Sequence, residues 1–192
     1  GRISCVVGPN GTGKSTLLKI LAGIYPLDGG TLTLGGEVQP ALSPREAQRR
    51  GVYLVPQEPR LMPDLSVAEN LFLGTLPRRR LPFAVDWSQM RERTAGLLAA
   101  VGLSLEPRTL AGQLSLAQQQ LVECARALAH GCRVVFFDEP TSPLTSHEAD
   151  MLFALMDQLR GRGLALGFIS HRLDEVERMA DRLTVLRDGR VV

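Results

Sequence analysis

The residues best suited to chemistry form one short segment near the start of the chain, Gly8–Thr16, which reads Gly-Pro-Asn-Gly-Thr-Gly-Lys-Ser-Thr. Gly8, Gly13, Lys14 and Ser15 fill every fixed position of the phosphate-binding loop pattern. Its glycines let the backbone curl so that consecutive N–H groups point inward, and a helix that follows adds the positive end of its dipole. The pattern therefore predicts a loop that holds a phosphate group.

Within this loop, the residue types predict a nucleoside triphosphate with its magnesium ion. Lys14 is expected to reach the β and γ phosphates, and the Ser15 hydroxyl to ligate Mg²⁺. Thr16 adds a further hydroxyl near the α phosphate. The nine residues expected to contact the nucleotide are Gly8, Pro9, Asn10, Gly11, Thr12, Gly13, Lys14, Ser15 and Thr16.

The elements around the loop fit this interpretation. The apolar run Ile3–Val7 predicts a strand before it, and Leu17, Leu18, Ile20 and Leu21 predict an apolar helix after it. Strand, loop and helix in this order are the context in which the pattern binds phosphate. A glycine-rich turn with a chance lysine is the alternative. It is less favoured because Lys14 and Lys19 are the chain's only lysines.

A second pair of chemical residues follows an apolar strand, Val134–Phe137, which ends in Asp138 and Glu139. Two adjacent acids at the exit of a buried strand must be desolvated or paired, and a bound Mg²⁺-nucleotide supplies the opposite charge. We expect Asp138 to hold the water shell of the metal. Glu139 is expected to polarise the attacking water as general base.

Composition limits the other functions open to the chain. Its 192 residues suffice for one domain, and its net charge of +2 is nearly neutral. The basic cluster Arg78–Arg80 lies between prolines and is interpreted as a solvated turn, so no nucleic-acid partner is expected. Cys5, Cys124 and Cys132 lack metal-ligand or disulfide spacing and are expected in the core, in a reducing compartment. No apolar run approaches the roughly 20 residues of a membrane span.

Strand and helix signals alternate along most of the chain, which predicts an α/β fold with a mostly parallel sheet, helices on both faces and ligands at the carboxyl ends of the strands. The further expected elements are strands Val52–Val55, Leu164–Ile169 and Leu183–Leu186, a hairpin across Gly35-Gly36, and helices starting near Pro44, Ser146 and Leu173.

One long stretch, residues 61–129, lacks strand signals and carries helix signals instead. Ser66 with Glu69 and Ser115 with Gln118 are capping pairs, and Trp87–Val101 predicts a helix between them. We therefore expect a helical subdomain, residues 61–129, inserted into an α/β core formed by residues 1–60 and 130–192.

The two ends of the chain predict a fragment of a longer protein. The first strand starts at Gly1, and Asp188–Val192 is interpreted as the start of a hairpin with no return strand. Strands that belong before Gly1 are expected to be truncated.

The order of these motifs resembles the ATP-binding-cassette (ABC) ATPases over essentially the whole chain. The resemblance implies a P-loop NTPase core of the RecA-like type with an inserted α-helical ABC subdomain. Gln57 looks like the glutamine of the Q-loop, which links Mg²⁺ to the helical subdomain. His171, in Ile169-Ser170-His171-Arg172, looks like the switch histidine that contacts the γ phosphate. The resemblance thus implies ATP and Mg²⁺ as cofactors, with Ser15, Gln57 and Asp138 around the metal.

The segment Leu114–Gln118, Leu-Ser-Leu-Ala-Gln, occupies the place of the family signature Leu-Ser-Gly-Gly-Gln. In the family this helix N-terminus reaches across a dimer to the partner's γ phosphate, so Ser115 and Gln118 are implied nucleotide contacts. Leu116 and Ala117 replace the signature glycines, and Ser142–Thr145 departs from the family's D-loop. The signature change bears on how this half completes its partner's site, and the D-loop change bears on communication between the two sites.

Such departures are familiar in the first of two fused ATPase halves of sugar importers, and Asp138–Thr145 and Ser170–Val176 are similar to that group. Tyr53–Pro59 is similar to the ATPase of autoinducer-2 importers. The resemblance implies a second ABC cassette, a membrane permease docked largely on Glu58–Leu73, and indirectly a solute-binding protein. It places the chain peripherally on the cytoplasmic face of the plasma (inner) membrane.

Two other functions share these motifs. A soluble ABC ATPase acting on ribosomes or DNA should show basic clusters or long insertions, and this sequence has neither beyond the short run Arg78–Arg80. A catalytically weak regulatory nucleotide-binding half is suggested by Leu116 and Ala117, although Glu139 and His171 are both present. Other phosphate-loop classes such as GTPases fit poorly, because Gln57, the signature segment and His171 would have no role in them.

Overall fold

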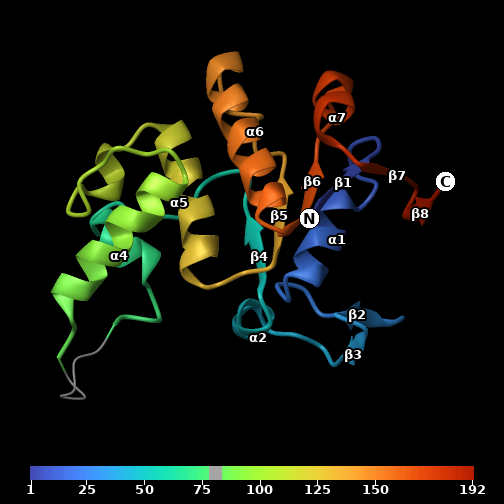
Figure 1. Ribbon diagram of the computed structural model, residues 1–192. Coiled ribbons are helices and arrows are strands. Elements are labelled where there is room, and N and C mark those ends of the chain that lie inside the picture. The colour runs from blue at the N-terminus through green and yellow to red at the C-terminus, as the bar shows by residue number, and fades with distance from the viewer. Residues whose placement is uncertain (78–83) are drawn as a thin grey trace.

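The computed structural model describes residues 1–77 and 84–192, and a six-stranded sheet lies at its centre with helices on both faces (Figure 1). The strand order is β4-β5-β6-β1-β7-β8, and the first five strands run parallel. This is the α/β architecture that the sequence predicts. The strands are β1 (Arg2–Val7), β4 (Val52–Val55), β5 (Val134–Asp138), β6 (Ala165–Ile169), β7 (Arg182–Arg187) and β8 (Arg190–Val191).

The register of the sheet places the carboxyl ends of four neighbouring parallel strands at the same end of the sheet, which is called the sheet edge below. Val55 pairs with Phe137, so Gln57 follows β4 next to the Asp138 end of β5. Ile169 pairs with both Asp138 and Val6, so the loops after β6 and β1 leave from the same edge. Parallel strands bind ligands at their carboxyl ends, and the predicted chemical residues of this core collect there.

The two faces of the sheet are covered by different helices. On one face lie α1 (Lys14–Leu21), α2 (Pro44–Arg49) and the hairpin of β2 (Leu32–Leu34) and β3 (Glu37–Gln39), and on the other lie α6 (Ser146–Gly161) and α7 (Leu173–Met179) (Figure 1). One face of α6 is apolar and buried in the core, with Leu152, Met156 and Leu159 at most 1% exposed. Removing such a stripe from water is the main stabilising contribution of the helix.

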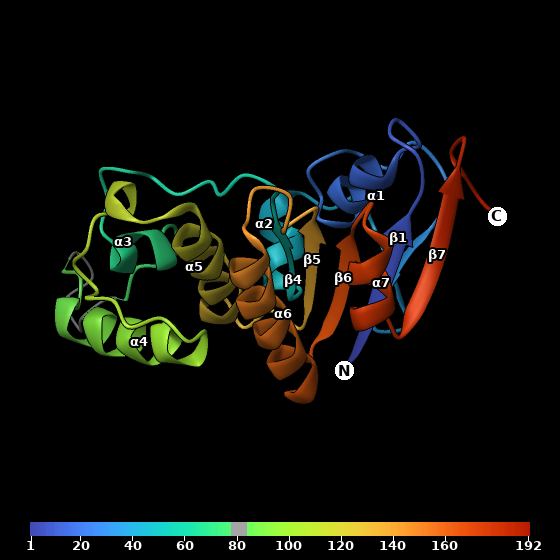
Figure 2. The same ribbon diagram turned by 90° about the horizontal axis from the view of Figure 1, so that it is seen from above.

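The helices of the 61–129 stretch form a group beyond the β4 edge of the sheet (Figure 2). They are α3 (Val67–Leu71), α4 (Trp87–Ala100) and α5 (Leu116–Ala129), with a 3-10 turn at Ala111–Gln113. Capping boxes at Ser66 and Ser115 start α3 and α5 as predicted. α3 and α4 pack on α5, and α5 packs against β4. The division into a core and an inserted subdomain stays a prediction, and the cluster Arg78–Arg80 lies outside the described residues.

The expectation that the final hairpin lacks a return strand is wrong. Residues 190–191 form β8, and Leu186 pairs with Val191 and Arg187 with Arg190 in antiparallel register. Asp188 and Gly189 both have positive φ, 50° and 74°. This Asp-Gly turn reverses the chain within two residues, so even a two-residue return segment can pair.

Two further expectations can be compared with the described residues. Cys5, Cys124 and Cys132 are buried and free, and burial raises the pKa of the Cys132 thiol to about 11, as for an unreactive core residue. Among the helices in residues 1–77 and 84–192, none has both the length and the apolar character needed to cross a bilayer.

Candidate active site

The phosphate-loop segment connects β1 to α1 and has the backbone shape that its glycines predict. Gly8 has φ 154°, and a Cβ at this position would lie 2.1 Å from the Leu186 carbonyl oxygen, so only glycine fits against β7. Gly13 has φ 94° at the N-cap of α1, where no side chain caps the helix. The first amides of a helix have no partners within it, and here they face the loop. This arrangement suits an anion.

Lys14 is turned inward in this structure and is 5% exposed. Its Nζ donates to the Gly8 and Pro9 carbonyl oxygens at 2.8 and 2.9 Å, which closes the loop on itself. Thr12 is also buried, and its hydroxyl donates to the Pro9 carbonyl at 2.9 Å. A triphosphate in the loop would offer Lys14 charged oxygens in place of these neutral carbonyls. Charged oxygens accept stronger hydrogen bonds than neutral carbonyls do.

The two residues predicted to bind the metal lie side by side. The Ser15 hydroxyl donates to Asp138 Oδ1 at 2.8 Å, although the two residues are 123 positions apart in sequence. Hydroxyl and carboxylate oxygens are the hard donors that Mg²⁺ prefers. In the described part of the chain no three His, Cys, Asp or Glu residues gather as a metal site. Mg²⁺ usually takes most of its ligands from water and substrate phosphates and only one or two from protein side chains.

Glu139 and His171 also come together, from the loops after β5 and β6. His171 Nδ1 lies 3.5 Å from Glu139 Oε2, and the exposed fractions of the two side chains are 56% and 20%. Glu139 has φ 46°, in the left-handed region that non-glycine residues rarely adopt. Such a conformation costs about 1–3 kcal/mol and persists only where the surrounding structure holds it.

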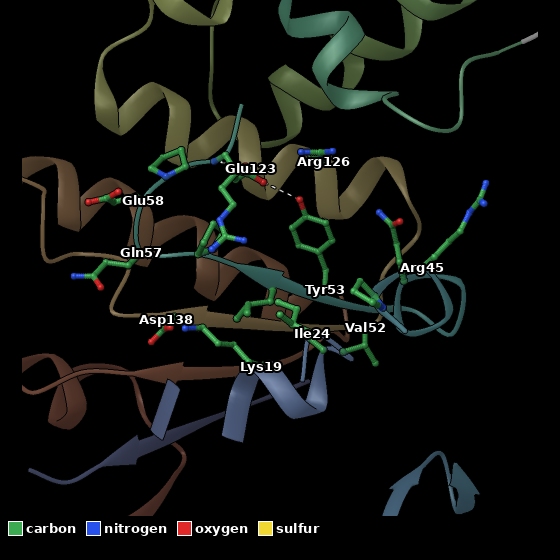
Figure 3. Close-up of a pocket in the computed structure, with 17 residues that line it drawn as sticks. Lys19, Ile24, Arg45, Val52, Tyr53, Gln57, Glu58, Glu123, Arg126 and Asp138 are labelled. Carbon is green, nitrogen blue, oxygen red and sulfur yellow. Dashed lines mark hydrogen bonds between the residues drawn. The ribbon is translucent and has the colours of Figure 1, made fainter. Parts of the chain in front are cut away.

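Gln57 and Asp138 line the same cavity of about 730 Å³, between α1, α2, β4 and α5 (Figure 3). Lys19, Arg45 and Arg126 are among the other residues that line it. Gln57 is exposed, whereas Asp138 is buried at the end of its strand. The link from the metal site toward the helical stretch through Gln57 stays a prediction.

Sequence reasoning missed a hydrogen-bonded carboxylate in the wall of this cavity. Glu123 on α5 is 1% exposed and accepts from the Tyr53 hydroxyl at 2.7 Å and from the Arg60 backbone amide at 2.9 Å (Figure 3). Burial raises the pKa of the Tyr53 phenol well above its ordinary value, and the neighbouring Glu123 charge raises it further. Glu123 thus ties the segment after Gln57 to the helix that begins at the signature position.

Ser115 and Gln118 cap α5 rather than binding the phosphate loop of this chain. The Ser115 amide donates to Gln118 Oε1 at 3.0 Å, and the Gln118 amide donates to Ser115 Oγ at 3.3 Å. The side chain of Leu116 between them is 40% exposed. These contacts use the two residues as a helix cap, and their contact with a partner's nucleotide stays a prediction.

A second missed group lies behind the Glu139–His171 pair. Thr141, Ser170 and Glu175 are 3–4% exposed and hydrogen-bonded together. Glu175 carries no signal in the sequence, because it sits among Asp174 and Glu177 on a short charged helix. Only the packing of α7 on the sheet distinguishes it from those exposed neighbours.

The amino-acid sequence of the chain is similar to those of known proteins. A family model described as "ABC transporter" matches residues 1–142. The ribose import ATP-binding protein RbsA 2 of Rubrobacter xylanophilus is 47% identical over the whole chain, which spans 37% of that relative. A putative ribose/galactose/methyl galactoside import ATP-binding protein of Burkholderia cenocepacia is 50% identical over 99% of the chain and 37% of the relative. The chain thus spans well under half the length of these proteins.

Solved structures give the same picture of the fold. A nucleotide-free ATP-binding cassette from an ABC transporter superposes with a TM-score of 0.87 at 28% identity, covering 100% of this chain and 79% of the other. A dimeric cassette in a post-hydrolysis state with ADP and phosphate superposes with a TM-score of 0.80 at 26% identity, covering 99% and 83%.

Proposed function

The chain belongs to the ABC transporter family, and we propose that it binds ATP with Mg²⁺ on the loop Gly8–Thr16 and hydrolyses it. The observation that carries this proposal is the convergence on one sheet edge of a phosphate loop, a Ser15–Asp138 pair 2.8 Å apart and a Glu139–His171 pair 3.5 Å apart. Anion, cation and general base each have a place within one site.

The binding roles follow from the atoms available. Backbone amides at the start of α1 and the Lys14 amine hold the phosphates. Ser15 and Asp138 hold Mg²⁺, with Gln57 entering from the β4 exit. The bound ion would neutralise charge on the phosphate oxygens during transfer.

The hydrolytic roles belong to the second pair. Glu139 is the general base that takes a proton from the attacking water, and its backbone conformation presents the carboxylate at the sheet edge beside Asp138. His171, whose Nδ1 lies 3.5 Å from Glu139 Oε2, would contact the γ phosphate.

We further propose that hydrolysis drives solute import in a larger assembly. Relatives at 44–50% identity are named as ribose or ribose/galactose/methyl galactoside import ATP-binding proteins, which favours a sugar as the solute. Autoinducer-2 is the alternative that rests on the resemblance of Tyr53–Pro59 alone. The assembly comprises a second cassette, a membrane permease on the face Glu58–Leu73, and indirectly a solute-binding protein. Met62 and Leu73 on that face are 49% and 38% exposed. The chain would lie peripherally at the cytoplasmic side of the membrane.

A catalytically weak half is the second candidate function, and Leu116 is the observation that favours it. Its exposed side chain stands at the start of α5, where a close approach to a partner's phosphate would need a small residue. This concerns the partner's site, whereas Glu139 and His171 serve the site of this chain.

The proposal is tested with Glu139→Gln in the full-length protein assembled with its permease. Turnover at this site should fall about 10²–10⁴-fold, the usual contribution of a general base, while ATP affinity stays as in the wild type because the phosphate loop is intact. Lys14→Ala should instead weaken ATP binding. Wild-type turnover at this site in Glu139→Gln would refute the role of Glu139.

A further inference from the structure

A buried carboxylate lies directly behind the proposed catalytic pair, and nothing in the proposed reaction uses it. Glu175 is on the first turn of α7, four residues after His171, and is 3% exposed. A buried acid is stable only when hydrogen-bonded or paired. Its partners therefore indicate what it holds in place.

Those partners come from both loops that carry the pair. The Thr141 hydroxyl lies 2.9 and 3.0 Å from the two oxygens of Glu175, and Thr141 is two residues after Glu139. The Ser170 hydroxyl donates to Glu175 Oε2 at 2.5 Å, and Ser170 immediately precedes His171. One carboxylate thus joins the β5 exit to the β6 exit.

The His171 loop has two additional contacts to this group. The Arg172 guanidinium lies 3.3 Å from Glu175 Oε1 and partly compensates its charge. The Arg172 amide donates to Ser170 Oγ at 3.1 Å, which fixes the backbone on the far side of His171. The side chain of His171 is 56% exposed and has little packing around it. Its position therefore depends largely on the backbone of the residues on either side.

We propose that Glu175 is a positioning residue for hydrolysis: by binding Thr141 and Ser170 together, it sets the placement of Glu139 against His171. This inference rests on the proposed ATP hydrolysis. Glu139 has a costly left-handed backbone and must be held by its surroundings. A general base displaced by about 1 Å can lose on the order of a hundredfold in rate.

The experiment replaces the hydroxyl that Glu175 binds on the Glu139 side. Thr141→Val keeps the size and branching but removes the hydroxyl, and Thr141→Ser keeps the hydroxyl but removes the methyl group. In the full-length protein assembled with its permease, Thr141→Val should lower kcat by about tenfold or more. KM for ATP should stay within about twofold, and Thr141→Ser should restore kcat to within about threefold of the wild type.

Two further variants test whether the effect passes through Glu175. Glu175→Gln should lower kcat with the same small change in KM, whereas Glu177→Gln, on the exposed face of the same helix, should match the wild type. Thr141→Val and Ser170→Ala should be non-additive in kcat, since each breaks the same junction. The Thr141 series keeps the test decisive where Glu175→Gln folds poorly.

The outcomes separate this inference from the proposed function. The ATPase rate of Glu139→Gln measures the background hydrolysis that does not occur at this site. If Glu139→Gln hydrolysed ATP as fast as the wild type, the proposed function would be overturned. A low background in Glu139→Gln, together with wild-type kcat in Thr141→Val, would overturn the positioning role alone. So would Thr141→Ser being slower than Thr141→Val, because the methyl group would then be what matters.

Discussion

At the scale of single residues, the site depends on pairs of side chains brought together from distant positions. Ser15 lies in the first turn of α1 and Asp138 ends β5, yet their oxygens are 2.8 Å apart. The hydrogen bond between them keeps both oxygens in a position to share a cation. The sequence motifs predicted a metal-binding role for each residue separately. The arrangement of β1 and β5 in the sheet explains why the two side chains lie together.

Substitution of Ser15 tests the metal role at this scale. Ser15→Ala removes one hard oxygen donor, so the Mg²⁺ concentration for half-maximal ATP hydrolysis should rise by about tenfold or more. Ser15→Thr keeps the hydroxyl and serves as the matched control, with Mg²⁺ dependence close to the wild type. The measurement is a magnesium titration of ATPase rate at saturating ATP. An unchanged Mg²⁺ dependence in Ser15→Ala would contradict the assignment.

At the scale of elements, most of the fold was predictable because its signals are local. Capping boxes at Ser43, Ser66 and Ser115 mark helix starts within four residues of sequence, and the apolar period of α6 marks its buried face. The phosphate loop, with strand before and helix after, needs no long-range information. These features placed the helices and parallel strands close to where the structure has them.

The parts that sequence did not predict depend on contacts between distant elements. Glu175 is one of three acids on the short charged helix α7, whereas Glu123 is the single acid of α5, and no local pattern indicates that either is buried. Their partners Tyr53, Thr141 and Ser170 belong to other strands and loops. The return strand β8 was missed because two residues are too few for a periodic signal.

The junction between β4 and α5 can be tested with the chain's two tyrosines. Tyr53→Phe removes the hydroxyl that donates to buried Glu123 at 2.7 Å, and the loss of a hydrogen bond to a charged group should lower the free energy of unfolding by about 2 kcal/mol. Tyr25 is 45% exposed, so Tyr25→Phe should change it by less than about 0.5 kcal/mol. Urea denaturation of the 192-residue chain measures both. Equal stabilities for the two variants would show that the Tyr53 contact contributes little.

At the scale of the whole molecule, the sheet gathers the phosphate loop, the acids after β5 and the histidine after β6 at one edge. The helices beyond β4 reach that edge through Gln57 and the cavity it shares with Asp138. The Glu123 contacts join the segment after β4 to α5 at this point. Lys14 Nζ donates to the Gly8 and Pro9 carbonyl oxygens across this loop, so a triphosphate there would compete for the same amine.

The most direct test of this account is a crystal structure of the chain grown with magnesium and a non-hydrolysable ATP analogue. It should show the triphosphate cradled by the amides at the start of α1, with Lys14 Nζ moved from the two carbonyl oxygens onto the β and γ phosphates. The analogue ordered at another surface, with Lys14 still bound to Gly8 and Pro9, would contradict the central claim.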